Sequence, residues 1–246
     1  MNTQYGNARL STADALEMRF TNASYDAPDK RTNIGEFEYD AQLSNIDTAV
    51  YHNHRTRQTK VANRGSITKA DWLITDPHIA FGAEGRSGRF KRAVKQTQDA
   101  HDKHGYSVST GGHSLGGSLS NYTTQQLGDE DWYDGSTSFN AGTSLAGGAN
   151  PLSKARRECR KKKNRPKYCD KTSNIYMKGD YVSNRNVACD VITFGMGGSM
   201  CDKNQGYGTI KVYDHRQSGL IPTITRRFAP LRMFQNADSH RMVHFR

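Results

Sequence analysis

The sequence predicts an α/β protein, in which a mostly parallel central sheet carries helices on both faces. The main observation is the segment 106–127, YSVSTGGHSLGGSLSNYTTQQL, which predicts a short strand, a sharp glycine turn and a helix. An amphipathic helix is expected just before this segment, and a further strand just after it. The length of 246 residues suits one domain of this class with a sizeable core.

The first 34 residues are polar and are expected to form an N-terminal extension to a domain that covers residues 35–246. A short helix is expected from Ser11, as its N-cap, through Phe20, followed by the turn-rich stretch 23–33. Residues 49–53, AVYHN, and 61–66, VANRGS, predict two short strands joined by a charged, hairpin-like turn. Such a pair of strands is expected at the first edge of the sheet.

Residues 88–104 predict an amphipathic helix that Gly105 ends. His101 and His104 fall in its last turn, where a cation suits the helix dipole, and both are expected to be solvated. Residues 136–145, STSFNAGTSL, predict the next core strand and a turn of small residues. The apolar face of the helix is formed by Phe90, Ala93, Val94, Thr97 and Ala100.

A basic insertion is expected at about residues 153–171, as an exposed loop or a short helix. Ten Lys and Arg residues lie between Lys154 and Lys171, against only Glu158 and Asp170. A solvated face is the simplest interpretation, and docking on an anionic lipid interface is the functional alternative. Nucleic acid is less favoured as a partner, because only Tyr168 within the block could stack on a base.

The composition limits the classes of protein that remain. Hydrophobic residues make up 34% of the chain and the mean hydropathy is −0.85, so the core must be concentrated in a few elements. No apolar run is long enough for a membrane span, and no secretory signal is seen at the N-terminus. We therefore expect a non-exported protein, cytoplasmic or associated with a virion. The net charge of +11 favours phosphate-bearing partners.

The four cysteines lie in the last ninety residues at separations that match no zinc site. They could pair in an oxidising compartment, but without a secretory signal free thiols are expected. The cysteines are Cys159, Cys169, Cys189 and Cys201.

Ser114 lies at the predicted turn between strand and helix, within a G-x-S-x-G pattern. A serine forced into so tight a turn exposes its hydroxyl above the sheet, and Gly112 and Gly116 provide the small neighbours that the backbone needs there. The following helix directs its free N–H groups at the same point, so the N–H of Leu115 can hold an oxyanion. The pattern therefore predicts a nucleophilic serine.

The segment GGHSLGGSLSNY resembles the nucleophile elbow of the class 3 lipase family, α/β-hydrolases that cleave acyl esters of glycerolipids. A second resemblance lies in Arg64, Gly65 and Ser66, followed by Asp71, Trp72 and Asp76 near the place where the family has D-W-x-x-D. The family supplies its other oxyanion-hole donor from the residue after that glycine, which implies Ser66 here. Asn63 departs from the family, where an apolar residue is usual at this position.

An activated serine also needs an imidazole base and a carboxylate, which follow it in this fold in the order Ser, acid, His. Asp180, in GDYVSN after a short predicted strand, resembles the acid of the family, although Ser183 stands where Pro is usual. Asp190 ranks second, and Asp170 is more simply an ion-pair partner within the basic block. His240, in ADSHRMVHF, resembles the terminal base of the family, with His244 and His215 as competitors.

The resemblance implies a serine esterase of glycerolipids, a lipase or phospholipase, that needs no metal and no organic cofactor. In this mechanism the triad is Ser114, Asp180 and His240, with the oxyanion held by Ser66 and Leu115. The alternative is a hydrolase fold without activity, retained as a basic structural or nucleic-acid-binding component, for example in a virion. The low hydrophobic content and the high charge motivate that alternative.

Overall fold

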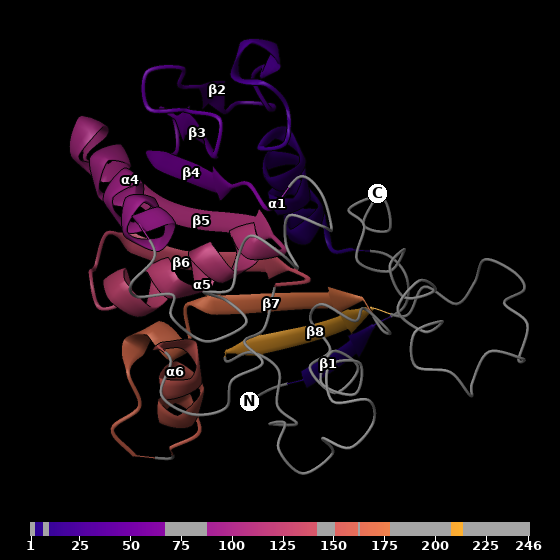
Figure 1. Cartoon of the computed structure of the whole chain (residues 1–246), viewed down its shortest axis with the longest axis vertical. Helices are drawn as coiled ribbons and strands as arrows, with labels where there is room; N and C mark the ends of the chain where they lie inside the picture. Colours follow the sequence, from indigo (N-terminus) through magenta and orange to yellow (C-terminus); the bar gives the residue numbers. More distant parts are fainter. Residues whose placement is uncertain are drawn as a thin grey trace, which may run out of the picture.

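The computed structural model describes residues 3–6, 10–66, 88–141, 151–161, 163–177 and 208–213. Within these ranges, eight strands form one sheet in the order β1-β8-β7-β6-β5-β4-β3-β2 (Figure 1). The strands are β1 (Thr3–Gly6), β2 (Glu38–Tyr39), β3 (Thr48–Asn53), β4 (Gln58–Asn63), β5 (Ser107–His113), β6 (Tyr133–Phe139), β7 (Thr172–Met177) and β8 (Thr209–Tyr213). The helices are α1 (Thr12–Ala23), α4 (Gly88–His104), α5 (Leu115–Leu127) and α6 (Pro151–Cys159), with short 3-10 turns η1 (Pro28–Lys30) and η3 (Lys167–Cys169).

The sheet is mostly parallel. From β4 through β5, β6, β7 and β8 to β1, each neighbouring pair of strands is parallel. Among the strands that the structure describes, only β3 runs against the others, because it pairs antiparallel with both β4 and β2. The expected strand pair at one edge of the sheet is therefore confirmed. In Figure 1 the arrowheads of the parallel strands, which mark their carboxyl ends, point to the same side of the sheet. β5 ends on this side, immediately before Ser114.

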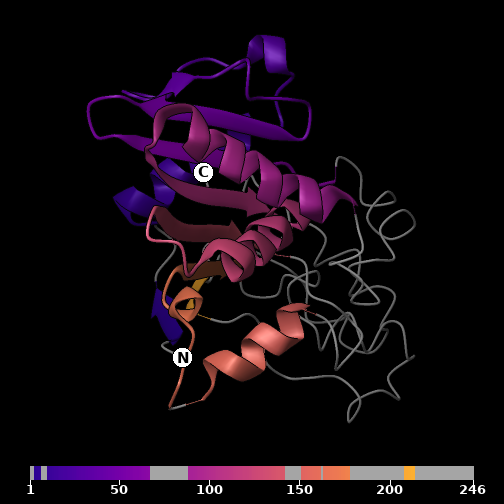
Figure 2. The same ribbon diagram turned by 90° about the vertical axis from the view of Figure 1, so that its left-hand side faces the viewer.

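Helices cover both faces of the sheet (Figure 2). On one face, α4, α5 and α6 share a single apolar cluster with η3. On the other face, Met18 of α1 packs on Phe139 and Ile175, and Phe20 of α1 packs on the cluster around Tyr51 of β3. This order of strands, with helices on both faces, fits an α/β-hydrolase fold. The predicted fold class is confirmed.

The N-terminal segment takes part in the sheet and in the core. The expected helix forms as α1, and the hydroxyl of its N-cap Ser11 accepts a hydrogen bond from the N–H of Asp14 at 3.1 Å. β1 pairs in parallel with β8 at the edge of the sheet. Lys211 of β8 donates to both carboxylate oxygens of Asp14, at 2.8 and 2.7 Å. The described residues 3–6 and 12–23 therefore contact the sheet through one strand and one helix.

Two predicted elements around the elbow form at the expected places. α4 ends before Gly105, which has a φ of +63° and donates its N–H to the carbonyl of His101. β6 begins at Tyr133, three residues before the expected start. Gly135 has a φ of +125°, and the pairing of β5 with β6 shifts register at Val108, so the alternation of side chains is interrupted at this point.

The interior beside α5 is largely polar. Four buried hydroxyls of this helix donate to the carbonyl four residues earlier in the chain. The hydroxyls of Thr124 and Thr110 also lie 2.8 and 2.7 Å from the Tyr133 hydroxyl. These bonds let a chain with few apolar residues bury its central helix. The four hydroxyls belong to Ser118, Ser120, Thr123 and Thr124.

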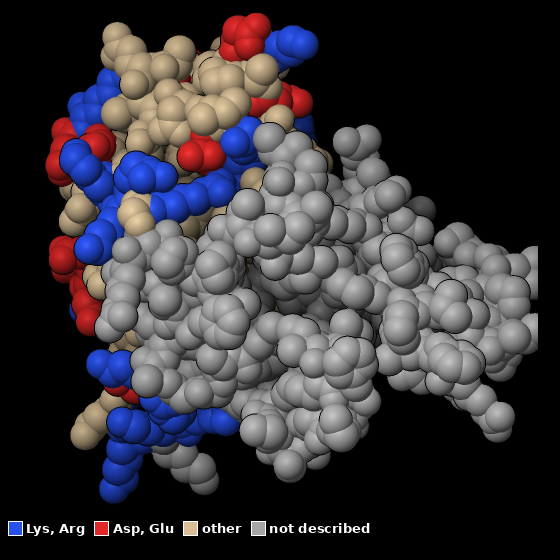
Figure 3. Space-filling model, viewed as in Figure 1, with Lys and Arg blue, Asp and Glu red and all other residues tan. Residues whose placement is uncertain are grey.

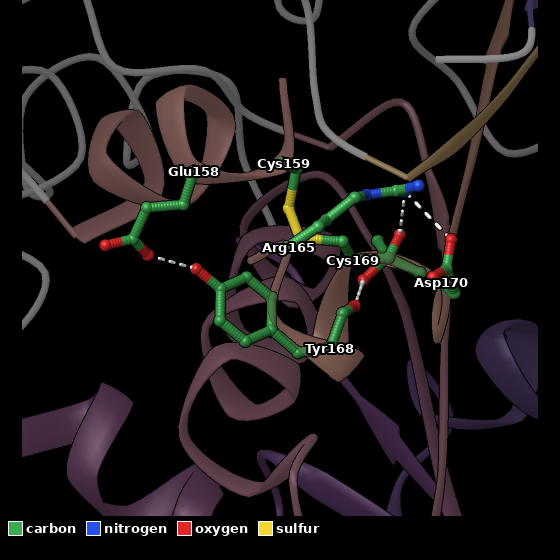
Figure 4. Close-up of a disulfide and its surroundings, with 7 residues drawn as sticks. Glu158, Cys159, Arg165, Tyr168, Cys169 and Asp170 are labelled. Atoms are coloured by element: carbon green, nitrogen blue, oxygen red, sulfur yellow. Dashed lines mark hydrogen bonds and ion pairs between the residues drawn. A yellow bond between two sulfur atoms is a disulfide. The ribbon is translucent and has the colours of Figure 1, made fainter. Parts of the chain in front are cut away.

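The basic insertion forms α6 and a loop that a disulfide closes. Cys159 and Cys169 are bonded, with their Cα atoms 5.4 Å apart, so the expectation of free thiols is wrong for this pair (Figure 4). Tyr168 and Cys169 pack with Cys159 in the cluster that α6 shares with α4 and α5, and cysteine spacing does not reveal these contacts with distant helices. Arg165 pairs with Asp170 at 2.8 Å, and the Tyr168 hydroxyl donates to Glu158. Cys189 and Cys201 lie outside the described residues.

Among the residues that the structure describes, no helix combines the length and the apolar character that crossing a membrane requires.

Candidate active site

Ser114 occupies a strained junction between β5 and α5. Its backbone has a φ of 56° and a ψ of −122°, a conformation that residues with a side chain rarely adopt. The residue is only 5% exposed, and its N–H donates to the carbonyl of Phe139 at the end of β6. Backbone strain of this kind persists only where the surroundings impose it, and it is concentrated at functional sites.

The glycines around Ser114 are required by close backbone contacts. A methyl group at Gly112 would lie 2.7 Å from the carbonyl oxygen of Asn63, which ends β4. A methyl group at Gly116 would lie 2.9 Å from the carbonyl carbon of Asn63 and 3.0 Å from that of Arg64. The start of α5 therefore rests directly on the chain that leads into Ser66.

The segments that carry Ser66 and Leu115 meet beside Ser114. A methyl group at Gly65 would lie 3.4 Å from the Cβ of Ser114 and 2.6 Å from the carbonyl oxygen of His113, so the 64–66 turn packs against the elbow. Leu115 is the first residue of α5, where backbone N–H groups have no partner within the helix. The two segments that carry the expected donors thus come from different parts of the chain.

Charged side chains brace the 64–66 turn from outside. Arg89 of α4 donates to the carbonyl of Arg64 at 2.7 Å. Arg64 donates to the carboxylate of Asp47 at 3.1 Å, and Arg89 lies 3.3 Å from the same carboxylate oxygen. Arg64 is therefore not a solvated turn residue, because its backbone and its side chain both hold the turn.

Tyr25 is a residue beside the elbow that the sequence did not single out. It follows α1, far from Ser114 in the sequence, and its hydroxyl lies 2.9 Å from Nδ1 of His113. Burial raises the pKa of this hydroxyl well above its usual value, so it remains protonated. The sequence places Tyr25 only in a turn-rich stretch, and nothing in that stretch connects it with residue 113.

The expected acid and base, Asp180 and His240, lie outside the described residues, as do their competitors Asp190, His215 and His244. β7 ends at Met177, three residues before Asp180, and it runs parallel to β5. The carboxyl end of β7 therefore lies on the same side of the sheet as Ser114, which follows the carboxyl end of β5. Asp170 instead lies before β7, paired with Arg165, as expected for a local ion-pair partner.

One group of side chains within the described part of the chain could hold a metal ion. Ligand atoms of Asp40, His52 and His104 lie within 4.8 Å of one another. However, Nε2 of His52 is 2.7 Å from Asp40, its Nδ1 is 2.8 Å from the hydroxyl of Thr59, and Lys103 lies 2.5 Å from Asp40. The carboxylate of Asp40 is already paired with His52 and Lys103, so we assign no metal to this group.

The two histidines at the end of α4 are not solvated as expected. His104 packs its ring 4.2 Å from that of His52, measured between ring centroids. His101 stacks on Trp132 at 4.3 Å, and its Nδ1 lies 2.8 Å from the carbonyl of Tyr106. These contacts with β3, Tyr106 and Trp132 bury part of both rings, and the position of a histidine relative to the helix dipole does not indicate them.

The chain matches no protein-family model and no curated protein. Solved structures to which it is similar are fungal lipases. Lip2 lipase from Yarrowia lipolytica shares 13% identity over 87% of this chain and 82% of that one, with a TM-score of 0.48. A triacylglycerol lipase from Penicillium expansum shares 16% identity over 84% and 82% of the two chains, with a TM-score of 0.44. Lipase II from Rhizopus niveus shares 16% over 76% and 78%, with a TM-score of 0.44. Likeness at this level says nothing of activity.

Proposed function

We propose that the chain is a serine esterase that hydrolyses acyl esters of glycerolipids. The observation that carries this proposal is the strained backbone of Ser114, held between the start of α5 and the 64–66 turn. A serine in this conformation serves no structural purpose that a glycine would not serve better, because a glycine adopts positive φ at little cost. The strain is explained if the hydroxyl must point at a substrate.

In the proposed mechanism, the hydroxyl of Ser114 attacks the acyl carbonyl while His240 takes its proton. Asp180 orients the imidazole and stabilises the imidazolium that forms. The N–H groups of Ser66 and Leu115 donate to the oxyanion, a contribution worth about 10²- to 10³-fold in rate for each such donor. His240 then protonates the leaving alcohol, and a water molecule activated by the same imidazole releases the fatty acid from Ser114.

The test is labelling with a fluorophosphonate probe, together with turnover of p-nitrophenyl butyrate and octanoate. We expect the native chain to label and Ser114→Ala to lose both labelling and turnover. Ser109→Ala, which removes a hydroxyl from the same region of β5, should retain both. Asp180→Ala and His240→Ala should each lower turnover far more than Asp190→Ala, His215→Ala and His244→Ala. Absence of labelling in folded native protein would contradict the proposal and favour a binding protein.

A glycerolipid substrate brings with it the question of how the protein meets a lipid surface. Within the disulfide-closed loop, Arg160, Lys161 and Lys163 are exposed. Figure 3 shows Lys and Arg gathered on this part of the surface, below the patch that α4 presents. We include docking on anionic phospholipid through this loop in the proposed function. Nucleic acid binding, the alternative for the same charges, would instead appear as a gel shift that added salt abolishes.

The loop lies near the amino ends of the parallel strands, whereas Ser114 lies at their carboxyl ends. Lys171 donates to the carbonyl of Tyr133, which begins β6, whereas Ser114 donates its N–H to the carbonyl of Phe139, which ends β6. Lys167 pairs with Asp131 on the same side as Lys171, at 3.5 Å. A lipid surface bound by the loop would therefore not be the surface that Ser114 faces, and docking and turnover should be separable by mutation.

A further inference from the structure

The hydroxyl of Tyr25 lies between the two segments that build the candidate oxyanion site. On one side it is 2.9 Å from Nδ1 of His113, the residue that precedes Ser114. On the other side it lies against the backbone of Gly65, the residue that precedes Ser66, where an added methyl group would overlap it. One side chain thus contacts the neighbour of the nucleophile and the neighbour of the first oxyanion donor.

The direction of these hydrogen bonds follows from the groups involved. Burial raises the pKa of the Tyr25 hydroxyl, and the Gly65 N–H, which can only donate, opposes this rise by attracting the hydroxyl oxygen. The hydroxyl proton then remains for a second partner, and among the described residues the acceptor in reach is Nδ1 of His113. Gly65 has little freedom to move elsewhere, because its α-carbon faces both the Tyr25 oxygen and the carbonyl of His113.

We propose that Tyr25 is a positioning residue, which ties the 64–66 turn to the elbow and so sets the distance of the Ser66 N–H from Ser114. This rests on the proposed function of the site. Tyr25 would not touch the substrate. Tyr25 would affect the rate through the Ser66 N–H, because a donor stabilises the oxyanion fully only if it already points at the position where the charge develops.

The first variant is Tyr25→Phe, which removes the hydroxyl and keeps the ring. We expect kcat to fall about 10- to 100-fold, the range that misplacement of a catalytic group by up to 1 Å produces. KM and the pH dependence of kcat/KM should not change, because Tyr25 neither holds the substrate nor titrates near neutral pH. Near-ultraviolet circular dichroism would check that the variant is folded.

The matched control is Tyr51→Phe. Tyr51 is fully buried and packs against Phe20 of α1, and its hydroxyl has no hydrogen-bond partner in the part of the chain that is described. This substitution removes the same atom from a neighbouring core position, so kcat should not change. A fall in kcat equal to that of Tyr25→Phe would show that the effect is general loss of packing and would overturn the proposal.

A second pair of variants tests the other end of the contact. His113→Asn can place an amide oxygen near the position of Nδ1 and accept from Tyr25, whereas His113→Leu cannot. We expect kcat of His113→Asn to exceed that of His113→Leu. Addition of Tyr25→Phe should lower kcat further only in the asparagine background. Equal effects of Tyr25→Phe in both backgrounds would contradict a hydrogen bond between the two side chains.

The contact with Gly65 can be measured without any enzyme assay. Arginine is followed by glycine only once in the chain, at residues 64 and 65. Protein labelled with ¹³C-carbonyl arginine and ¹⁵N-glycine therefore gives one amide signal in a carbonyl-filtered NMR spectrum. We expect this Gly65 proton signal to move upfield in Tyr25→Phe and to stay in place in Tyr51→Phe.

The two readouts separate the possible failures. An unmoved Gly65 signal in Tyr25→Phe would overturn the proposed tie. A moved signal with unchanged kcat, in an active native enzyme, would overturn the positioning role. If the native protein neither labels nor turns over esters, the proposed function fails, and the Gly65 signal still decides whether Tyr25 holds the turn.

Discussion

Gly116→Ala perturbs the contact between α5 and the 64–66 turn most directly. The added methyl group would lie 2.9 and 3.0 Å from the carbonyl carbons of Asn63 and Arg64, and closer still to the Asn63 carbonyl oxygen. Real contacts of such a methyl group are essentially never shorter than 3.0 Å, so relief of the overlap with the Asn63 oxygen requires the two segments to separate by at least about 1 Å. The atoms in the way belong to the backbone, and no rotation of a side chain relieves the overlap.

The separation has consequences for stability and for activity. Overpacking of this kind costs about 1–3 kcal/mol of unfolding free energy. The displaced turn carries the N–H of Ser66 away from Ser114, and catalytic groups tolerate only about 0.5 Å of such displacement. We therefore expect kcat for p-nitrophenyl butyrate to fall about 10- to 100-fold at temperatures where the variant remains folded.

Two further glycine variants provide the comparison. At Gly117, an added methyl group would meet Ala141 at 2.9 Å and Ser138 at 3.1 Å, on the side of β6, so Gly117→Ala should lose stability with a smaller loss of kcat. At Gly88, it would meet only the end of a flexible arginine, and both quantities should stay near native values. Native kcat in folded Gly116→Ala, or equal losses of kcat at 116 and 117, would refute the reasoning.

Two further predictions concern acid stability and the basic loop. Burial lowers the pKa of His52 and of His104, so the unfolded chain binds more protons and the unfolding free energy should fall as the pH drops below about 6.5. Burial opposes ionisation of Asp40, but hydrogen bonds from Lys103, the Leu43 N–H and His52 outweigh burial and lower the pKa of this carboxyl to about 2. The lowered pKa contributes about 2 kcal/mol to the unfolding free energy, and this contribution is lost as the pH falls from about 4 to about 2. Urea titrations of the native chain and Asp40→Asn would show this second loss in the native chain alone, and identical acid profiles would contradict it. Replacement of residues 160–163 by Ser should weaken binding to anionic vesicles at low salt by about 10²- to 10³-fold and leave turnover of soluble esters unchanged. The control replaces three exposed cations elsewhere, namely Lys30, Arg55 and Arg57, and binding reduced as much by the control would exclude docking through the loop.

The elements that the sequence predicted well are those with local signals. Ser11 caps α1 as expected, and Gly105 ends α4. The strand and helix around Ser114 also form at the predicted positions, because the turn chemistry of the glycines and the helical period lie within about twenty residues of one another. Local pattern and final fold agree wherever short-range contacts decide the conformation.

The features that could not be predicted depend on contacts between distant parts of the chain. β1 pairs with β8 although more than two hundred residues separate them in the sequence. Tyr25 reaches His113 only because α1 packs on the face of the sheet from which that histidine projects. The disulfide between Cys159 and Cys169 spans only ten residues, but Tyr168 and both cysteines pack in a cluster with residues of the distant helices α4 and α5. The roles of Asp180 and His240 stay predictions, since both lie outside the described residues.

The hydroxyl-rich interior beside α5 has a thermodynamic consequence. Exposure of apolar surface raises the heat capacity of unfolding, whereas exposure of polar surface lowers it. A domain that buries Ser118, Ser120, Thr123 and Thr124 around its central helix should have a change in heat capacity below the usual value of about 12–15 cal/mol/K per residue. Its stability would then vary less steeply with temperature than that of a domain with an aliphatic core, so the elbow would keep its geometry over a wider thermal range.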